Sequence, residues 1–246
     1  MRDYSHGLPE HQPDAHAQRR HGAASGVKAG HVANRVVSVG SLSRAELLAQ
    51  LLDDATFDTF QSPRGFTTFT GRMKECRWVP NMDFVVRETR AVVEGPMNFI
   101  RFGTCGSVRK EVAPGSVVVS GKGSVMVMRN PDAFFPDAVG EDYYRVSRVM
   151  PASSALSKPL VASMKSKTRL SMLNLRSPDS AFDDRNEHLV EDLAKTHPDV
   201  HTVEMETFHL LDLAQRSRGS IQATAAVLVV ANRITEKSSS PTSSQL

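Results

Sequence analysis

Short runs of β-branched residues alternate with longer amphipathic stretches along the chain. Residues 35–39 (Arg-Val-Val-Ser-Val) are typical of a strand that ends at Gly40. Residues 223–231 are nearly all apolar, as expected for a central strand buried on both faces. We expect further strands at 66–70, 98–102, 117–119 and 125–128, and helices at 81–94, 186–194 and 206–215. The alternation of strands and helices predicts an α/β domain.

A helix is also expected directly after the first strand. Residues 43–46 (Ser-Arg-Ala-Glu) match a capping box, in which Ser43 caps the helix and Glu46 reaches back to it. The buried face of this helix is expected to consist of Leu47, Leu48, Leu51 and Leu52. The turn before it would place Gly40 at the carboxyl end of a strand and at the start of a helix.

Residues 1–26 and 238–246 are predicted to be polar tails around a single domain at 27–237. Histidines recur every five residues in the first tail, which matches neither a helix face nor a strand face, so a disordered tail is favoured over a metal site. No apolar segment follows Met1, so we expect no signal peptide. The final Ser-Gln-Leu differs by one residue from the peroxisomal Ser-Lys-Leu signal. We favour a chance match over a peroxisomal signal, and we expect a cytoplasmic protein.

Composition and charge narrow the function classes. The 246 residues are 40% hydrophobic and 23% charged, which is ordinary for a globular protein, and no apolar run is long enough to cross a membrane. The 30 basic and 27 acidic residues are scattered, so we expect no nucleic-acid interface. Two cysteines, Cys76 and Cys105, are too few for a disulfide framework or a cysteine-rich zinc site.

Two glycine-containing turns have the composition of an anion site. Residues 101–106 (Arg-Phe-Gly-Thr-Cys-Gly) combine an arginine and a hydroxyl with glycines that let a ligand approach the backbone. Residues 40–44 (Gly-Ser-Leu-Ser-Arg) repeat these ingredients at a helix N-terminus, where anions are favoured. Each turn alone is more often a tight connection between a strand and a helix. Cys105 is a candidate nucleophile, but no histidine lies near it in the sequence, so a packing role is favoured.

Residues 203–207 (Val-Glu-Met-Glu-Thr) place two carboxylates at the start of a helical pattern. One interpretation is a helix N-terminus with solvated acids that complement the helix dipole. The alternative is a sugar clamp, in which a carboxylate accepts hydrogen bonds from paired ribose hydroxyls while Met205 lies on the apolar face of the sugar.

With these motifs in order, the chain resembles nucleoside phosphorylases of the uridine phosphorylase type over most of residues 32–235. The matching segments are 33–41, 64–71, 99–106, 114–118, 203–207 and 229–233. The resemblance implies a three-layer α/β/α sandwich with a mixed central sheet. It also implies phosphorolysis of uridine or a related pyrimidine nucleoside, which yields free base and ribose 1-phosphate.

The resemblance assigns phosphate binding to four positions and extends the site across a subunit boundary. The residues that match the phosphate site of the family are Gly40, Arg44, Arg101 and Thr104. Arg64 matches an arginine that reaches into the phosphate site of the neighbouring subunit. This match implies a homodimer, or a larger assembly of dimers, with shared active sites.

The resemblance also assigns the nucleoside side of the site. Met205 and Glu206 match the ribose-binding pair, and Thr104 lies near the sugar as well. Glu204 and Arg233 match positions beside the base. The implied reaction uses inorganic phosphate as co-substrate and needs no metal or other cofactor. Neither a nucleic acid nor a membrane is expected as a partner.

The chain departs from the family pattern at three places. Residues 72–80 are expected to lack a strand and a glycine-rich turn that form one wall of the phosphate site. The stretch 174–182 lacks the Phe-x-x-x-Gln-x-Arg box that recognises uracil, since a start at Phe182 would put Asn186 and His188 in its last two positions, inside a predicted helix. No long C-terminal helix is expected after Arg233.

These departures leave two alternatives open. One is a shortened, non-catalytic paralogue that keeps a phosphate and ribose pocket. The other is a nucleosidase-like hydrolase in which water replaces phosphate. The retention of Arg44, Arg64 and Arg101 argues against the hydrolase, because a water nucleophile does not need an arginine cluster.

Overall fold

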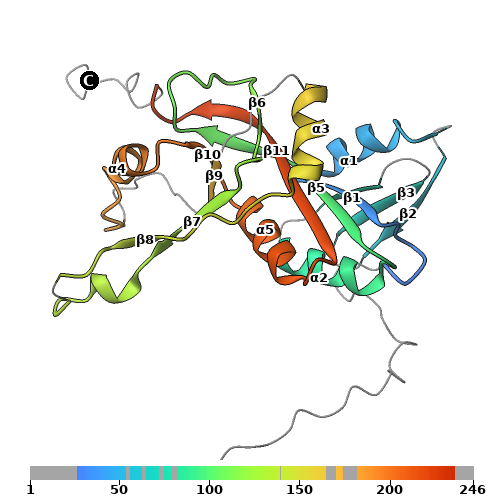
Figure 1. The fold of residues 1–246 in the computed structure, drawn as a ribbon, viewed down its shortest axis with the longest axis horizontal. Helices are drawn as coiled ribbons and strands as arrows, with labels where there is room; N and C mark the ends of the chain where they lie inside the picture. The colour runs from blue at the N-terminus through green and yellow to red at the C-terminus, as the bar shows by residue number, and fades with distance from the viewer. Residues whose placement is uncertain are drawn as a thin grey trace, which may run out of the picture.

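The computed structural model of the chain describes residues 27–53, 56–62, 65–71, 75–78, 82–138, 140–164, 170–173 and 182–235 (Figure 1). The predicted tails at 1–26 and 238–246 lie outside these residues, as do Arg64, most of the stretch 174–182, and the segment that follows Thr235. The expectations for those segments are therefore not tested by the fold.

The described strands are β1 (Arg35–Val39), β2 (Phe57–Gln61), β3 (Thr67–Gly71), β4 (Glu75–Trp78), β5 (Met97–Ser107), β6 (Val117–Val119), β7 (Ser124–Arg129), β8 (Tyr144–Val146), β9 (Leu170–Leu173), β10 (Val200–Glu204) and β11 (Ile221–Asn232). The described helices are α1 (Leu42–Ala49), α2 (Met82–Val92), the short 3-10 helix η3 (Pro131–Phe134), α3 (Ser154–Met164), α4 (Leu189–Thr196) and α5 (Thr207–Arg216). Every strand and helix expected from the hydrophobic pattern is confirmed, although several ends differ.

The strands form one mixed sheet in the order β2-β3-β4-β1-β5-β10-β9-β7-β8, with β11 paired to β5 and β6. β5 is the central strand. Its first half pairs in parallel with β1, its whole length pairs in parallel with β11, and its last two residues pair antiparallel with β10. Because β1, β5 and β11 are parallel, their carboxyl ends meet at one edge of the sheet, where ligands collect in open α/β folds.

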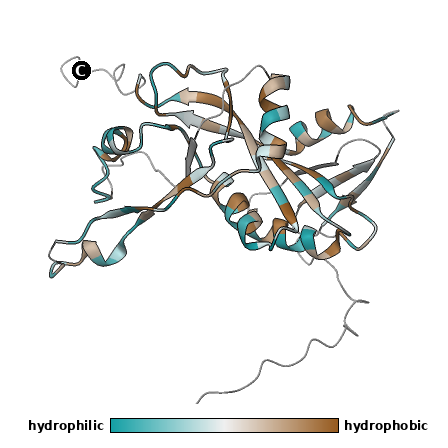
Figure 2. Cartoon of the chain, viewed as in Figure 1, coloured by the Kyte–Doolittle hydropathy of each residue, from teal (hydrophilic) through white to brown (hydrophobic). Residues whose placement is uncertain are grey.

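Helices cover both faces of this sheet, as Figure 1 shows. Val36 of β1 packs in the same cluster as residues of α2 and α5, whereas Val39 packs with residues of α1 on the other face. Ser157 of α3 contacts Thr224 of β11 through their hydroxyls at 2.9 Å, on the side away from α5. The α1 and α3 layer, the sheet, and the α2 and α5 layer make up the predicted three-layer sandwich. The helices carry both polar and apolar residues (Figure 2), as amphipathic covering helices should.

Four predictions about individual elements are wrong in detail. Ser41, not Ser43, is the N-cap of α1, because Ser41 is extended and its hydroxyl accepts a hydrogen bond from the backbone of Arg44. Ala45 and Ala49 form the buried face of α1 with Leu52, whereas Leu47 and Leu51 are exposed. Helix α4 begins at Leu189 instead of residue 186. Strand β11 is buried on both faces only from Ala223 to Val227, since Leu228 and Val230 are 41% and 58% exposed.

The expectation that residues 72–80 lack a strand is also wrong. Strand β4 lies in this stretch and pairs in parallel with β1 and antiparallel with β3. Charged residues occupy three of the positions from 74 to 77, so the sequence has no strand-like alternation there. Neighbours on both sides supply the backbone hydrogen bonds that stabilise β4 in place of intrinsic strand propensity.

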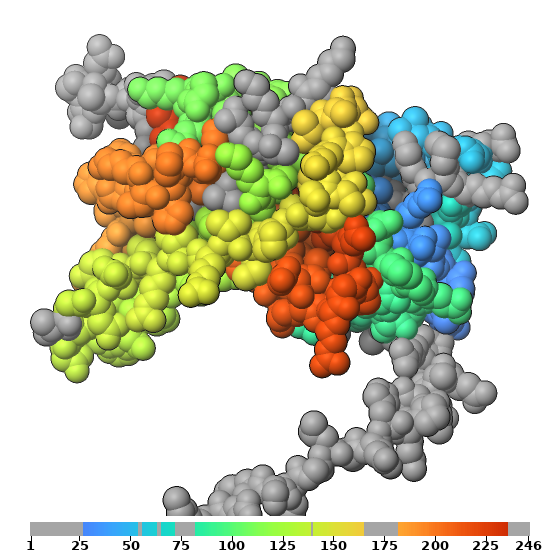
Figure 3. Space-filling model, in the orientation of Figure 1, coloured from blue at the N-terminus to red at the C-terminus, as the bar shows by residue number. Residues whose placement is uncertain are grey.

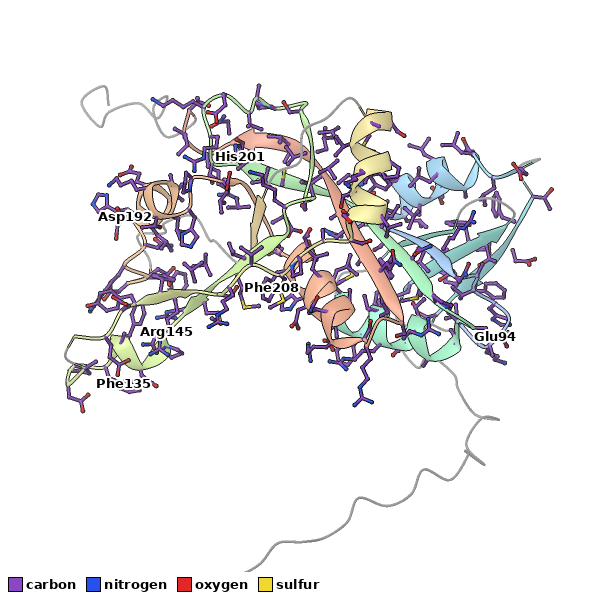
Figure 4. All side chains as sticks on the ribbon, in the orientation of Figure 1. Glu94, Phe135, Arg145, Asp192, His201 and Phe208 are labelled. Carbon is purple, nitrogen blue, oxygen red and sulfur yellow. The ribbon has the colours of Figure 1, made fainter. Side chains whose placement is uncertain are left out.

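A hairpin of β7 and β8, with η3 between the two strands, extends away from the body of the molecule (Figure 3). Phe135 and Arg145 lie on this hairpin and Phe208 lies on α5, well separated from them (Figure 4). The hairpin therefore contributes nothing to the pocket described next.

Candidate active site

A pocket of about 330 Å³ opens where the carboxyl ends of β1, β5 and β11 meet the N-terminus of α5. The antiparallel pairing of β10 with the end of β5 brings residues 204–206 back alongside β5. The pocket is lined by Gly40, Arg44, Arg101, Thr104, Cys105, Gly106, Val203, Glu204, Met205, Glu206, Val230 and Arg233. Every predicted site residue within the described chain is in this set.

The predicted glycine-rich turn at residues 103–106 is instead part of strand β5, which continues to Ser107. Regular pairing with β11 holds this stretch straight as far as Cys105, and β11 shifts register by one residue opposite Gly106. Glycine is a poor strand former and occupies two of the four positions from 103 to 106, so the sequence signal there is that of a turn. The long, fully paired neighbour β11 overrides this local preference.

Arg101 lies at the base of the pocket and is only 3% exposed. Its Nη2 donates a hydrogen bond to Glu206 Oε2, and its Nε lies 3.6 Å from Glu204 Oε2. Its Nη1 has no hydrogen-bond partner among the described residues. Buried donors are almost always paired in native proteins, so this N–H indicates a place for an anionic or carbonyl ligand.

Glu204 has a structural role at the start of α5. Its carboxylate accepts hydrogen bonds from the backbone N–H of Glu206 at 2.9 Å and of Thr207 at 2.9 and 3.1 Å. Burial raises the pKa of Glu204, while Arg101 and the two N–H groups oppose the shift. The interpretation of Glu204 as a solvated acid at a helix start is therefore wrong: it caps the helix, but from a buried position.

Glu206 and Met205 face the open part of the pocket. The Glu206 side chain is 19% exposed and carries the ion pair with Arg101, and Met205 is 68% exposed. An accessible carboxylate beside an exposed, flexible thioether fits a ligand with hydroxyl groups and an apolar face.

The turn between β1 and α1 supplies a second arginine. Arg44 is half-buried, and its Nε donates a hydrogen bond to Ser41 Oγ at 3.0 Å. Gly40 lies directly beneath the Arg44 guanidinium. The first turn of α1 contains no acidic residue, so the N-terminal end of this helix is free of negative charge.

Arg233 lies at the opposite end of the pocket, in the turn that follows β11. Its backbone N–H donates to Ser107 O at 2.9 Å. The preceding residue, Asn232, is 2% exposed and donates to the carbonyls of Arg109 and Val112 at 2.9 and 3.1 Å. Asn232 therefore anchors the turn that presents Arg233.

Cys105 is buried against Val112, Val118, Val227 and Val229. Burial, with a smaller contribution from Glu204, raises the pKa of Cys105 to about 12. A thiol with such a pKa is not a nucleophile at neutral pH. The burial and the raised pKa agree with the packing role favoured from the sequence.

Sequence reasoning did not single out Val203 or Val230 as pocket residues. Val230 is 58% exposed although it belongs to an apolar strand. Val230 is skipped in the pairing at the one-residue register shift opposite Gly106, and no sequence signal marks that shift. Among the described residues, no three histidine, cysteine or acidic side chains are grouped as metal ligands. No described helix is both long and apolar enough to cross a membrane.

The comparisons with known proteins identify the family of the chain. The family model of the phosphorylase superfamily matches residues 34–245. A solved structure from a study of two uridine phosphorylases of the oomycete Phytophthora capsici is 59% identical, with a TM-score of 0.82 over 89% of this chain and 88% of that one. No curated protein sequence matches the chain.

A more distant structure has the same fold. The purine nucleoside phosphorylase from Toxoplasma gondii, solved with immucillin-H, is 15% identical and has a TM-score of 0.67 over 93% of this chain and 89% of that one. The family match over most of the chain and the high identity to the oomycete enzyme agree with the fold. The chain therefore belongs to the phosphorylase superfamily, as a nucleoside phosphorylase of the uridine phosphorylase type.

Proposed function

We propose that the protein is a pentosyltransferase that cleaves uridine or a related pyrimidine nucleoside with inorganic phosphate. The observation that carries this proposal is the buried, ion-paired Arg101, with an unpartnered N–H in a pocket that also holds a sugar-compatible carboxylate. The 59% identity to a solved uridine phosphorylase supports the choice of uridine as substrate. The protein would act in the salvage and breakdown of pyrimidine nucleosides in the cytoplasm.

The phosphate would bind at the end of the pocket formed by β1 and β5. Arg101 and Arg44 would neutralise its charge from two sides, and the N–H groups at Gly40 and Thr104 would supply further donors. Two arginines around an anion explain why a hydrolase that uses water is the weaker alternative.

The ribose would lie between the phosphate and Met205. Glu206 would accept hydrogen bonds from the paired ribose hydroxyls while it keeps its ion pair with Arg101. The hydroxyl of Thr104 lies on the same side of the pocket, close to both the sugar and the phosphate. This arrangement ties sugar orientation to phosphate binding through a single arginine.

The base would lie toward Arg233. The guanidinium would donate to a carbonyl of the pyrimidine and stabilise the negative charge that the leaving base acquires. Glu204 contacts the pocket as well, but its carboxylate is engaged by two backbone N–H groups and Arg101, so we assign it to positioning.

The reaction follows from these placements. The bond between the anomeric carbon and the base nitrogen breaks, and its electron pair leaves with the base, so the sugar develops cationic character. The phosphate, held beneath the sugar, stabilises this cation and donates an oxygen lone pair to the anomeric carbon. The products are ribose 1-phosphate and the free base, with no metal or covalent enzyme intermediate required.

We further propose that the active form is a homodimer or an assembly of dimers, in which Arg64 completes the phosphate site of the partner subunit. The sequence match at residues 64–71 supports this arrangement. Light scattering would give the mass of the assembly. Mixing an Arg64→Ala chain with an Arg101→Ala chain should restore part of the activity, because one site of the mixed dimer would be intact.

The function is tested by incubating the purified protein with uridine, with and without inorganic phosphate. Release of uracil that requires phosphate, together with formation of ribose 1-phosphate, supports the proposal. Equal uracil release without phosphate would instead identify a hydrolase. No turnover of uridine, thymidine or inosine by the folded protein would identify a non-catalytic paralogue. Thymidine and inosine also report the preference for sugar and base.

A further inference from the structure

Each arginine of the pocket lies against a glycine. A Cβ atom built at Gly103 would come within 2.9 Å of Arg101 Nη2, one built at Gly106 within 2.7 Å of Arg233 Nε, and one built at Gly40 within 3.0 Å of Arg44 Nη2. Real Cβ atoms essentially never approach other heavy atoms to less than 3.0 Å. The guanidinium groups of Arg101 and Arg233 therefore occupy space that a side chain at position 103 or 106 would fill, and Arg44 would have to shift by a few tenths of an ångström for a side chain at position 40.

The geometry of β5 explains the first contact. In a strand, residues i and i+2 point to the same face, so the side chain of Arg101 and a Cβ at position 103 would share one side of the sheet. The guanidinium folds forward along the strand over Gly103, where it reaches Glu204 and Glu206. None of the three glycines has a positive φ, so backbone conformation does not require glycine there.

We propose that Gly103, Gly106 and Gly40 are positioning residues. Because they have no side chain, the guanidinium groups of Arg101, Arg233 and Arg44 can lie close to the backbone. This proposal rests on the proposed function, because it divides the glycines between two substrates. Gly103 and Gly40 serve the phosphate end of the pocket, and Gly106 serves the nucleoside end.

The surroundings of each arginine rank the three positions. Arg101 is almost fully buried and ion-paired to two carboxylates, so it cannot move away from a methyl group without breaking those pairs. Arg233 is half-buried and would have to move from the closest contact of the three. Arg44 is also half-buried, but it faces a looser contact and is held to a single hydroxyl. The expected effect therefore falls in the order Gly103, Gly106, Gly40.

The kinetic test compares Gly103→Ala with Gly106→Ala. Gly103→Ala should raise the KM for phosphate by about tenfold or more and the KM for uridine by less, because a displacement of about 1 Å in a substrate-positioning group is costly and Arg101 reaches the sugar only through Glu206. Gly106→Ala should show the reverse. A matched control is Gly71→Ala, whose Cβ would come within 2.7 Å of the Thr56 carbonyl but meets no arginine. The control should lower the melting temperature without separating the two KM values.

The second test is a double-mutant cycle in thermal stability, which does not depend on catalysis. Gly106→Ala should lower the melting temperature in the wild-type background and leave it unchanged or raise it slightly in the Arg233→Ala background, where the guanidinium is gone and alanine only restricts the unfolded chain. The same cycle is run for Gly103 with Arg101→Ala, and with Arg101→Met if the alanine variant does not fold.

The outcomes separate the two proposals. Loss of the glycine effect in both arginine-free backgrounds supports the positioning role even if the wild-type protein turns over no nucleoside, in which case only the proposed function fails. An equal penalty with and without the arginine would overturn the positioning role, as would unchanged KM values in an active Gly103→Ala enzyme.

Discussion

The two arginines at the phosphate end of the pocket are held in opposite ways. Arg101 comes from the middle of the central strand, is 3% exposed, and contacts two carboxylates. Arg44 comes from the first turn of an eight-residue helix, is half-buried, and is bound to a single serine hydroxyl. The first is fixed before any substrate arrives, whereas the second can adjust.

This difference separates preorganisation from adaptation within one site. A buried cation that is already desolvated and correctly oriented needs little reorganisation when charge develops in the transition state. An arginine at the rim gains most of its interaction when the anion binds. We therefore expect Arg101 to act on both the rate of the chemical step and the affinity for phosphate, and Arg44 to act mainly on the affinity for phosphate.

The largest effect is expected for Arg101→Ala. Loss of the guanidinium should lower kcat/KM by about a thousandfold, the scale seen when a preorganised electrostatic group is removed. It also leaves the buried Glu204 carboxylate without its cation, which should cost about 3–5 kcal/mol in the free energy of unfolding. Steady-state kinetics and urea denaturation measure the two effects. The kcat/KM of Arg101→Lys should lie between those of wild type and Arg101→Ala, because lysine cannot reach both carboxylates as a fork. A kcat/KM of Arg101→Ala within tenfold of wild type would contradict the preorganised role of Arg101.

A smaller effect is expected for Arg44→Ala. The KM for phosphate should rise by about tenfold, which corresponds to the loss of one charge-assisted hydrogen bond. The kcat at saturating phosphate should stay close to wild type, and the free energy of unfolding should change by less than about 0.5 kcal/mol. Initial rates at varied phosphate and uridine check this split. A fall in kcat as large as that of Arg101→Ala would remove the distinction between the two arginines.

Glu204, which is buried beside Arg101, predicts that the stability of the protein depends on pH. Its pKa is raised by burial above the ordinary 4.5, so the folded state binds the proton more tightly than the unfolded state. The stability that this group contributes is therefore full below pH 4.5 and is lost as the pH rises through the raised value. Chemical denaturation of wild type and Glu204→Gln between pH 4 and 8 isolates this contribution. The stability difference, wild type minus variant, should fall with rising pH; a rise would mean that Arg101 and the α5 N–H groups outweigh burial.

The smallest effect is expected for Ser41→Ala, which removes the hydroxyl that binds Arg44. This substitution removes the N-cap of α1 and should cost about 1 kcal/mol in the free energy of unfolding. It also releases Arg44 from its anchor, so the KM for phosphate should rise slightly. Ser43→Ala is the matched control, because the structure places Ser43 inside the helix and not at its cap. Thermal unfolding measures the stability of both variants. Equal destabilisation by the two substitutions would contradict the assignment of Ser41 as the N-cap of α1.

The sequence predicted the fold class correctly, and the predicted site residues within the described chain line one pocket. The β-branched run at 35–39 and the apolar run at 223–231 are confirmed as β1 and β11, because runs of this kind have few other stable arrangements. The match to a known family identified the pocket residues because their types and order survive in the linear sequence. Helix α3 was not expected, since small residues and the internal Pro159 obscure its periodicity.

The local exceptions arise where pairing partners override propensity. The stretch from Gly103 to Gly106 has the composition of a turn, yet it is a strand because β11 pairs along it. Strand β4 has charged residues at two of its four positions, yet it pairs with β1 on one side and β3 on the other. Such backbone hydrogen bonds come from segments distant in the chain, so no local window of sequence contains them.

By itself the sequence determined which chemical groups this protein has and in which order they occur: three arginines of the site, the acidic pair around Met205, and glycines beside them. Only the tertiary structure decided what each group contacts. It made Glu204 a buried helix cap, made Arg101 a preorganised cation, and left Arg44 adjustable at the rim. The physical reason is that residue type sets the available chemistry, whereas burial and orientation depend on strands and helices brought together from the whole chain.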